Sequence, residues 1–106
     1  MATSNETIEY VLETLNSNSI TVRKMFGEYA LYYEKRVVGF VCDDVIFLKI
    51  TPKTTLFLGS DFKRGPAYKG SSDYFIIDEE IIEKKGELLQ LLELCSLDVT
   101  ERIIKN

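Results

Sequence analysis

The sequence contains no histidine, and this absence removes several kinds of chemistry at once. Histidine is the commonest general base in enzymes and the commonest transition-metal ligand in proteins. Without it, Ser–His and Cys–His nucleophile pairs cannot form. The Walker loop and the GxGxxG, GxSxG and HExxH patterns are also absent. We therefore expect a non-enzymatic protein with no catalytic residues, no metal site and no cofactor.

Long apolar runs are missing too, and none approaches the roughly 18 residues of a membrane-spanning helix. The first six residues carry neither the basic nor the apolar segment of a secretion signal. These absences predict a cytoplasmic protein without membrane contact. The length of 106 residues fits a single domain over residues 1–106. A formal charge of −4 does not attract a polyanion from a distance.

Cysteine is scarce, with Cys42 and Cys95 as the two examples and no CxxC pair between them. Both residues sit among apolar neighbours, and free cysteine is among the most buried residue types. We predict two buried thiols. A disulfide is not expected in a reducing compartment, and the spacing gives no zinc or redox motif.

The first half of the chain predicts one helix followed by four strands. Apolar residues at positions 8, 11, 12 and 15 form one stripe, which predicts a helix over residues 5–16. The following stretch is rich in β-branched and aromatic residues. Turn signals divide it into strands at residues 20–26, 29–34, 37–42 and 45–50. Because the connections are so short, these strands must form an antiparallel meander.

The second half predicts a short helix over residues 53–58, with Leu56, Phe57 and Leu58 packing inward. A loop over residues 59–72 leads to a fifth strand, residues 73–77, and to a helix from the Asp78 cap to about residue 95. Gly86 is a candidate break in that helix. We expect residues 97–106 either to extend the helix or to fray. The fold class is α+β, with an antiparallel sheet of about five strands in the order α-β4-α-β-α and helices on one face.

The predicted sheet has apolar side chains on both faces. In residues 45–50, Ile46, Leu48 and Ile50 form a purely apolar side that should meet the helices. Val45 and Phe47 lie on the other, mixed side. Since neither face is clearly polar, we expect something to cover part of the second face. Gly39, inside a predicted strand, indicates a bulge or a close approach of two backbones.

The surplus of apolar and aromatic residues favours an interaction with another protein. The partner is either a second copy, as a homodimer, or another protein. The candidate partner surface consists of Tyr29, Tyr33, Val45, Phe47, Leu88, Leu91 and Leu92.

Two other interpretations stay open. In the first, a basic and aromatic loop contacts nucleic acid, helped by a basic pair in an earlier strand. Its candidate residues are Phe62, Lys63, Arg64, Tyr68 and Lys69, together with Arg23 and Lys24. Lys35 and Arg36 would add charge if the fold brought them to the same edge. In the second, a metal-dependent enzyme would use Asp43, Asp44 and Glu28, but we favour a turn between two strands as the explanation of the Asp pair.

Four segments in order resemble the N-terminal domain of the TfoX/Sxy competence regulators. They are KMFGEYALYY at residues 24–33, VGFVCDDVIFLK at 38–49, GPAY at 65–68 and YFIIDEE at 74–80. The resemblance covers residues 8–94. It implies a fold like that of secretion chaperones, which often dimerise, and a link to the regulation of natural transformation. It supplies no catalytic residues.

Full-length members of that family promote transcription of DNA-uptake genes with a cyclic-AMP-responsive activator and carry a second, helical C-terminal domain. Because this sequence stops at Asn106, the resemblance implies a stand-alone form of the N-terminal domain.

Overall fold

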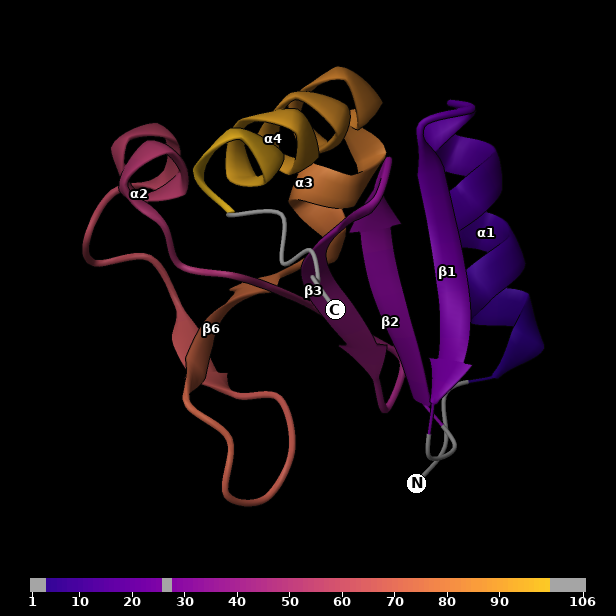
Figure 1. The fold of residues 1–106 in the computed structure, drawn as a ribbon, viewed down its shortest axis with the longest axis horizontal. Helices are drawn as coiled ribbons and strands as arrows, with labels where there is room; N and C mark the ends of the chain where they lie inside the picture. Colours follow the sequence, from indigo (N-terminus) through magenta and orange to yellow (C-terminus); the bar gives the residue numbers. More distant parts are fainter. Residues whose placement is uncertain (1–3, 26–27, 100–106) are drawn as a thin grey trace, which may run out of the picture.

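The computed structural model describes residues 4–25 and 28–99 and shows an α+β fold. The strands form one antiparallel sheet in the order β1-β2-β3-β4-β6-β5 (Figure 1). In chain order the elements are α1 (Asn5–Leu15), β1 (Ile20–Met25), β2 (Glu28–Tyr33), β3 (Arg36–Cys42), β4 (Val45–Leu48), α2 (Pro52–Leu58), β5 (Arg64–Pro66), β6 (Asp73–Ile77), α3 (Glu79–Glu83) and α4 (Lys85–Asp98). The predicted fold class is confirmed. None of these helices is long and apolar enough to cross a membrane.

The meander formed by β1 to β4 is confirmed, and its tight turns explain its order. The turn between β3 and β4 consists of Asp43 and Asp44, with φ angles of 54° and 65°. Two successive residues with positive φ turn the chain in the sense that matches the twist of a hairpin. Asp tolerates this conformation better than most residues. The prediction that the Asp pair forms a turn is therefore confirmed.

Two segments in the second half of the chain differ from the prediction in their secondary structure. The segment expected as a loop over residues 59–72 contains a sixth strand, β5, which pairs with β6 at the edge of the sheet. Its sequence, Arg-Gly-Pro, reads as a loop because proline cannot serve in a central strand, but an edge strand tolerates it. The predicted C-terminal helix is two helices, α3 and α4. They meet at Lys84, whose φ and ψ of −95° and 72° are not helical, and Gly86 lies inside α4.

The short helix α2 forms where expected but presents a different side to the core. A capping box starts it: the Thr51 side chain accepts from the Thr54 N–H at 3.2 Å, and the Thr51 N–H donates to Thr54 Oγ1 at 2.8 Å. Thr54 is completely buried, whereas Leu56 is 86% exposed and Phe57 is 36% exposed. The prediction that residues 56–58 all pack inward is therefore wrong for Leu56 and Phe57, and only Leu58 packs partly against the core.

The core lies between one face of the sheet and the helices α1, α3 and α4, and we call this face the covered face. Its strand residues include Leu31, Val41, Ile46, Leu48, Phe75 and Ile77. As predicted, Ile46 and Leu48 meet the helices. α2 packs on α4 rather than on the sheet (Figure 1).

Gly39 lets two backbones approach within this layer. A Cβ atom on Gly39 would lie 2.2 Å from the Phe47 carbonyl oxygen, where no side chain fits. The pairing of β2 with β3 also shifts register between Leu31 and Tyr32, opposite this part of β3. The close approach and the irregularity predicted at Gly39 are thus both present in β3.

Candidate functional site

The second face of the sheet carries a row of apolar residues that no helix covers in the part of the chain that the structure describes. Cross-strand partners point to the same side of a sheet, so the pairing defines the row. Ala30 pairs with Phe40, Phe40 with Phe47, and Phe47 with Ile76. Val45 lies on the same side as Phe47, since residues two apart share a face. We call this side the open face.

Phe40 is the centre of an aromatic group on the open face. Its ring meets the ring of Tyr74 edge-on at 5.7 Å and the ring of Tyr68 edge-on at 6.2 Å. Tyr68 belongs to the connection between β5 and β6, so it reaches back from the edge of the sheet to β3. Burial raises the pKa of Tyr74 above its ordinary value. The connection covers part of the second face, as expected, but Tyr68 itself stays 55% exposed.

A hollow of about 330 Å³ lies beside this aromatic group, lined by Met25, Glu28, Tyr29, Phe40, Cys42 and Tyr68. Burial, followed by the negative charges of Glu28 and Asp43, raises the pKa of the Cys42 thiol to about 11. The thiol is therefore protonated at neutral pH and acts as part of an apolar wall rather than as a nucleophile. The hollow can receive an apolar side chain.

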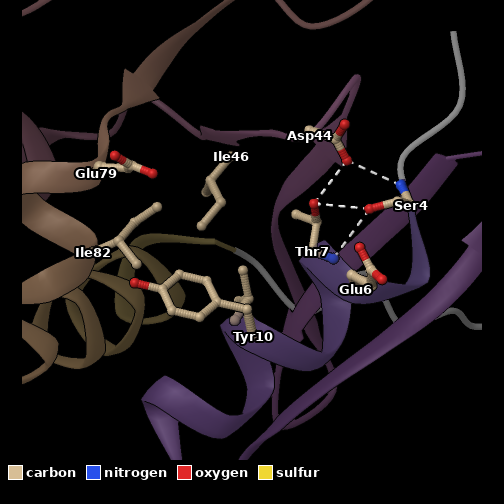
Figure 2. A pocket seen from close by; sticks show the side chains of 9 residues that line it. Ser4, Glu6, Thr7, Tyr10, Asp44, Ile46, Glu79 and Ile82 are labelled. Carbon is tan, nitrogen blue, oxygen red and sulfur yellow. Dashed lines mark hydrogen bonds between the residues drawn. The ribbon is translucent and has the colours of Figure 1, made fainter.

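A second, larger hollow of about 450 Å³ lies between α1, α3 and the turn after β3 (Figure 2). Glu6, Asp44 and Glu79 stand around it, and Tyr10 extends along its floor towards Ile82. Asp44 has a structural task here. Its Oδ1 accepts from the Ser4 N–H at 2.9 Å and from the Thr7 hydroxyl at 2.8 Å, which holds the turn to the start of α1.

These hydrogen bonds, led by the one from the Ser4 N–H, lower the pKa of the Asp44 carboxyl. Glu28 has a comparable internal contact, since its Oε1 accepts from the Asp43 N–H at 3.1 Å. Within residues 4–25 and 28–99, no group of three or more His, Cys, Asp or Glu side chains is placed to hold a metal ion. Sequence patterns give no signal for the tie between Asp44 and α1, because its partners lie 37 and 40 residues away.

Comparison with known proteins places this geometry in a family. The model of the TfoX N-terminal domain matches residues 12–98, which include every strand of the sheet. The chain belongs to the TfoX N-terminal domain family. It is also 37% identical over 75 residues to an "Uncharacterized 12.7 kDa protein in trpE 5'region" of Spirochaeta aurantia. That match covers 71% of this chain and 64% of the relative, so the chain spans less than two thirds of the relative's length.

In this TfoX N-terminal domain, the residues predicted as a partner surface lie in three different places. Val45 and Phe47 are half-buried on the open face. Tyr29 and Tyr33 belong to the opposite side, where they pack partly against the core, although Tyr29 also lines the hollow beside Phe40. The prediction was wrong for Leu88, Leu91 and Leu92, which are completely buried between α4 and the sheet. The broad leucine stripe of α4 is wide because the helix contacts the sheet on one side and α1, α2 and α3 on others.

The predicted nucleic-acid contact of the TfoX N-terminal domain does not form a single patch. Arg23 and Lys24 lie on β1 at one edge of the sheet, whereas Phe62 to Lys69 lie around β5 at the other. Phe62 packs edge-on against Phe75 at 5.8 Å. The Arg64 guanidinium lies over the Phe75 ring at 5.2 Å and donates to the Ser60 carbonyl at 2.7 Å. Two members of the predicted loop are therefore used in packing that edge.

The remaining basic residues do not form a single positively charged patch either. Lys63 and Lys69 are exposed near β5 at the edge of the sheet, whereas Arg36 lies on β3 and donates to the Ser96 carbonyl at 3.1 Å. Both cysteines are free and buried, as predicted. Cys42 lies on the open face, and Cys95 lies on the buried side of α4, where burial raises its pKa to about 12. Sequence reasoning missed Phe40, Tyr74 and Ile76, although their alternation with core residues indicates the open face.

Proposed function

We propose that this chain is a regulatory protein-interaction domain that binds a partner protein across the open face of its sheet. The observation that carries this proposal is the row formed by Phe40, Phe47 and Ile76, flanked by Val45 and Tyr74. Aromatic residues are enriched where proteins meet, because they bury a large area at a small cost in conformational entropy. The adjoining hollow of about 330 Å³ offers a pocket for an anchoring side chain.

The charge around this face favours a protein over a nucleic acid. Glu28 and Asp43 lie at the end of the face where the hollow opens, and the chain carries a formal charge of −4. A polyanion is repelled by that arrangement, whereas an apolar protein surface is not. A second copy of the chain and a transcription regulator both meet this requirement. The family relationship supports a regulatory role connected with competence.

We assign the chain no catalytic role. The sequence lacks histidine, and the thiol nearest the open face has a pKa of about 11, far above neutral pH. The Asp pair that a metal enzyme would use forms a turn, and Asp44 is engaged by Ser4 and Thr7. Regulation by contact requires none of these groups to react.

A photo-cross-linking amino acid placed at position 47 or at position 56 tests the proposal in cells. Phe47 lies on the open face, and Leu56 is an exposed apolar residue on α2, so the second position is a matched control. We expect a discrete adduct from position 47 and none from position 56. The mass of the adduct then identifies the partner or shows a second copy.

The purified partner allows the contact to be measured. Phe47→Ser should weaken binding by about 30-fold, the effect of losing an interface hot spot, and Leu56→Ser should leave it unchanged. Thermal unfolding of both variants checks that the fold is intact. Equal adducts from the two positions, or wild-type affinity for Phe47→Ser, would contradict binding through the open face.

A further inference from the structure

The outer edge of β1 exposes backbone groups that can pair with another strand. β1 pairs with β2 alone among the described elements and ends the sheet, beside α1 (Figure 1). The Glu34 N–H donates to the Ser19 carbonyl at 2.6 Å, so Ser19 and Glu34 form a hydrogen-bonded pair. Such pairs alternate along an antiparallel ladder. Thr21 and Arg23 therefore bond to β2, and Val22 and Lys24 direct their N–H and C=O groups outward.

Nothing in the described chain occupies these outward groups. Among the described residues, no turn, loop or helix cap forms a backbone hydrogen bond with Val22 or Lys24. The opposite edge is different, since β5 has three residues, including Gly65 and Pro66, and offers little to a new strand. β1 has six residues and two outward rungs. An incoming antiparallel strand can exchange both hydrogen bonds with each of them.

The side chains along this edge determine the charge of the strand that fits. Arg23 and Lys24 are both exposed and point to opposite faces, because successive strand residues alternate. Arg23 also lines a hollow of about 350 Å³ with Lys35, Glu34, Thr21, Val22 and Tyr32. Glu34 offsets one of the two cations there. Carboxylates on two successive residues of an incoming strand would lie beside Arg23 on one face and Lys24 on the other.

We propose that the outer edge of β1 binds an extended, acidic segment of a partner protein by strand addition. The edge is distinct from the apolar row around Phe40, although Arg23 points to the same side of the sheet as that row because it pairs with Ala30. This binding goes beyond the proposed function and does not depend on it. Main-chain hydrogen bonds to Val22 and Lys24 supply the attachment, and Arg23 and Lys24 select the charge.

A second copy of β1 fits this edge poorly. A two-fold pairing that uses both outward rungs places Val22 opposite Lys24 and therefore Arg23 opposite Arg23 of the other copy. A shift by one rung in one direction places Lys24 opposite Lys24. A shift in the other direction places Lys24 opposite Ile20, whose N–H already donates to the Ser17 carbonyl at 3.3 Å. Like charges directly opposite each other destabilise a strand pair, so an acidic partner is favoured.

The competing explanation is that the two cations only protect the edge, since lysine and arginine on edge strands prevent unwanted pairing. Two acetylated, amidated peptides separate the explanations: Thr-Val-Glu-Glu-Val-Thr and its matched control Thr-Val-Lys-Lys-Val-Thr. The readout is amide hydrogen exchange and chemical shift of the isotope-labelled chain. In the free protein we expect fast exchange at Val22 and Lys24 and slow exchange at Arg23.

Addition of the acidic peptide should slow exchange at Val22 and Lys24 and shift their amides. The basic peptide should bind more weakly by between about twofold and about thirtyfold, the range expected for two cross-strand charge pairs. The charge reversal Arg23→Glu with Lys24→Glu should invert this preference. The matched reversal Lys63→Glu with Lys69→Glu, at the far edge, should not.

Val22→Pro supplies a test that charge alone cannot mimic. Its missing N–H is an outward one, so the pairing with β2 survives, but an incoming strand loses a donor and meets the ring. This variant should still fold cooperatively, with a somewhat lower unfolding temperature because Val22 packs partly against the core, and it should bind neither peptide. Equal binding of both peptides, no response to either, slow Val22 exchange in the dilute free protein, or protection that grows with protein concentration alone would each overturn the proposal.

Discussion

The two faces of the sheet come from the same strands but differ in the type and the burial of their side chains. The covered face presents mainly aliphatic residues such as Leu31 and Leu48, which pack in the core with leucines of α4 and are completely buried. Phe75 is a buried ring among them. The open face presents rings such as Phe40 and Tyr74, which pack on one another and stay half-buried. Aliphatic side chains pack together at high density, whereas rings on a partly solvated surface leave apolar area exposed that another molecule can contact. We infer that the covered face holds the fold together and the open face is available for recognition.

The first prediction compares truncation on the two faces. Leu91→Ala should lower the free energy of unfolding by about 2–5 kcal/mol, because the side chain is fully buried and leaves a cavity. Val45→Ala should cost about 1 kcal/mol or less, since this residue is half-buried on the open face and solvent can fill the space. Urea unfolding of both variants measures the difference. Equal losses would mean that the open face is as much a part of the core as the covered one.

The second prediction uses two glycines to separate backbone contact from side-chain contact. A Cβ on Gly39 would meet the Phe47 carbonyl oxygen, a backbone atom at 2.2 Å, so Gly39→Ala should destabilise the fold by about 1–3 kcal/mol. A Cβ on Gly65 would meet only the end of the Ile76 side chain at 3.3 Å, so Gly65→Ala should cost about 0.5 kcal/mol or less. The same unfolding experiment tests both, and a tolerated Gly39→Ala would show that β3 and β4 can separate.

Sequence patterns predicted the elements whose signals are local. The meander followed from its turns, and the first helix followed from its stripe and from Ser4, whose side chain caps it by accepting from the Thr7 N–H. The patterns failed where a residue is judged against neighbours distant in the chain. The leucines of α4 look like a surplus until the sheet, α1 and α2 surround that helix. Likewise, Arg23 and Lys69 look like one basic set until the strand order places them at opposite edges.

The sequence predicted which residues of β4 face away from the helices, but it did not predict the aromatic group beside them. Val45 and Phe47 were assigned to the second face correctly, because alternation alone decides that. The aromatic group around Phe40 was not found, since it requires Tyr68 to cross from the far edge of the sheet to β3. A contact of that kind depends on the path of a connection, which turn residues do not specify.

The last prediction compares the reactivity of two thiols, one on each face of the sheet. Neither thiol is expected to affect the free energy of unfolding at neutral pH. Cys42 has a pKa of about 11 and Cys95 a pKa of about 12, in both cases mainly because of burial. Since each folded-state pKa lies above the ordinary value, any stability linked to these thiols is present below about pH 9 and is lost as the pH rises towards 11–12. At pH 8 both thiolates are scarce, so both should react with a disulfide reagent more than about a hundredfold slower than a free thiol.

The two cysteines should nevertheless differ in rate. Cys42 lines a hollow on the open face, whereas Cys95 is fully buried on the side of α4 that faces the sheet, with its thiol donating to the Val38 carbonyl at 3.6 Å. Cys42 should therefore be labelled at least about ten times faster, and Cys95 only when the molecule unfolds. Cys42→Ala and Cys95→Ala variants, read by mass spectrometry, assign each rate. Faster labelling of Cys95 would reverse the comparison, because it would make the helical layer the one that opens first.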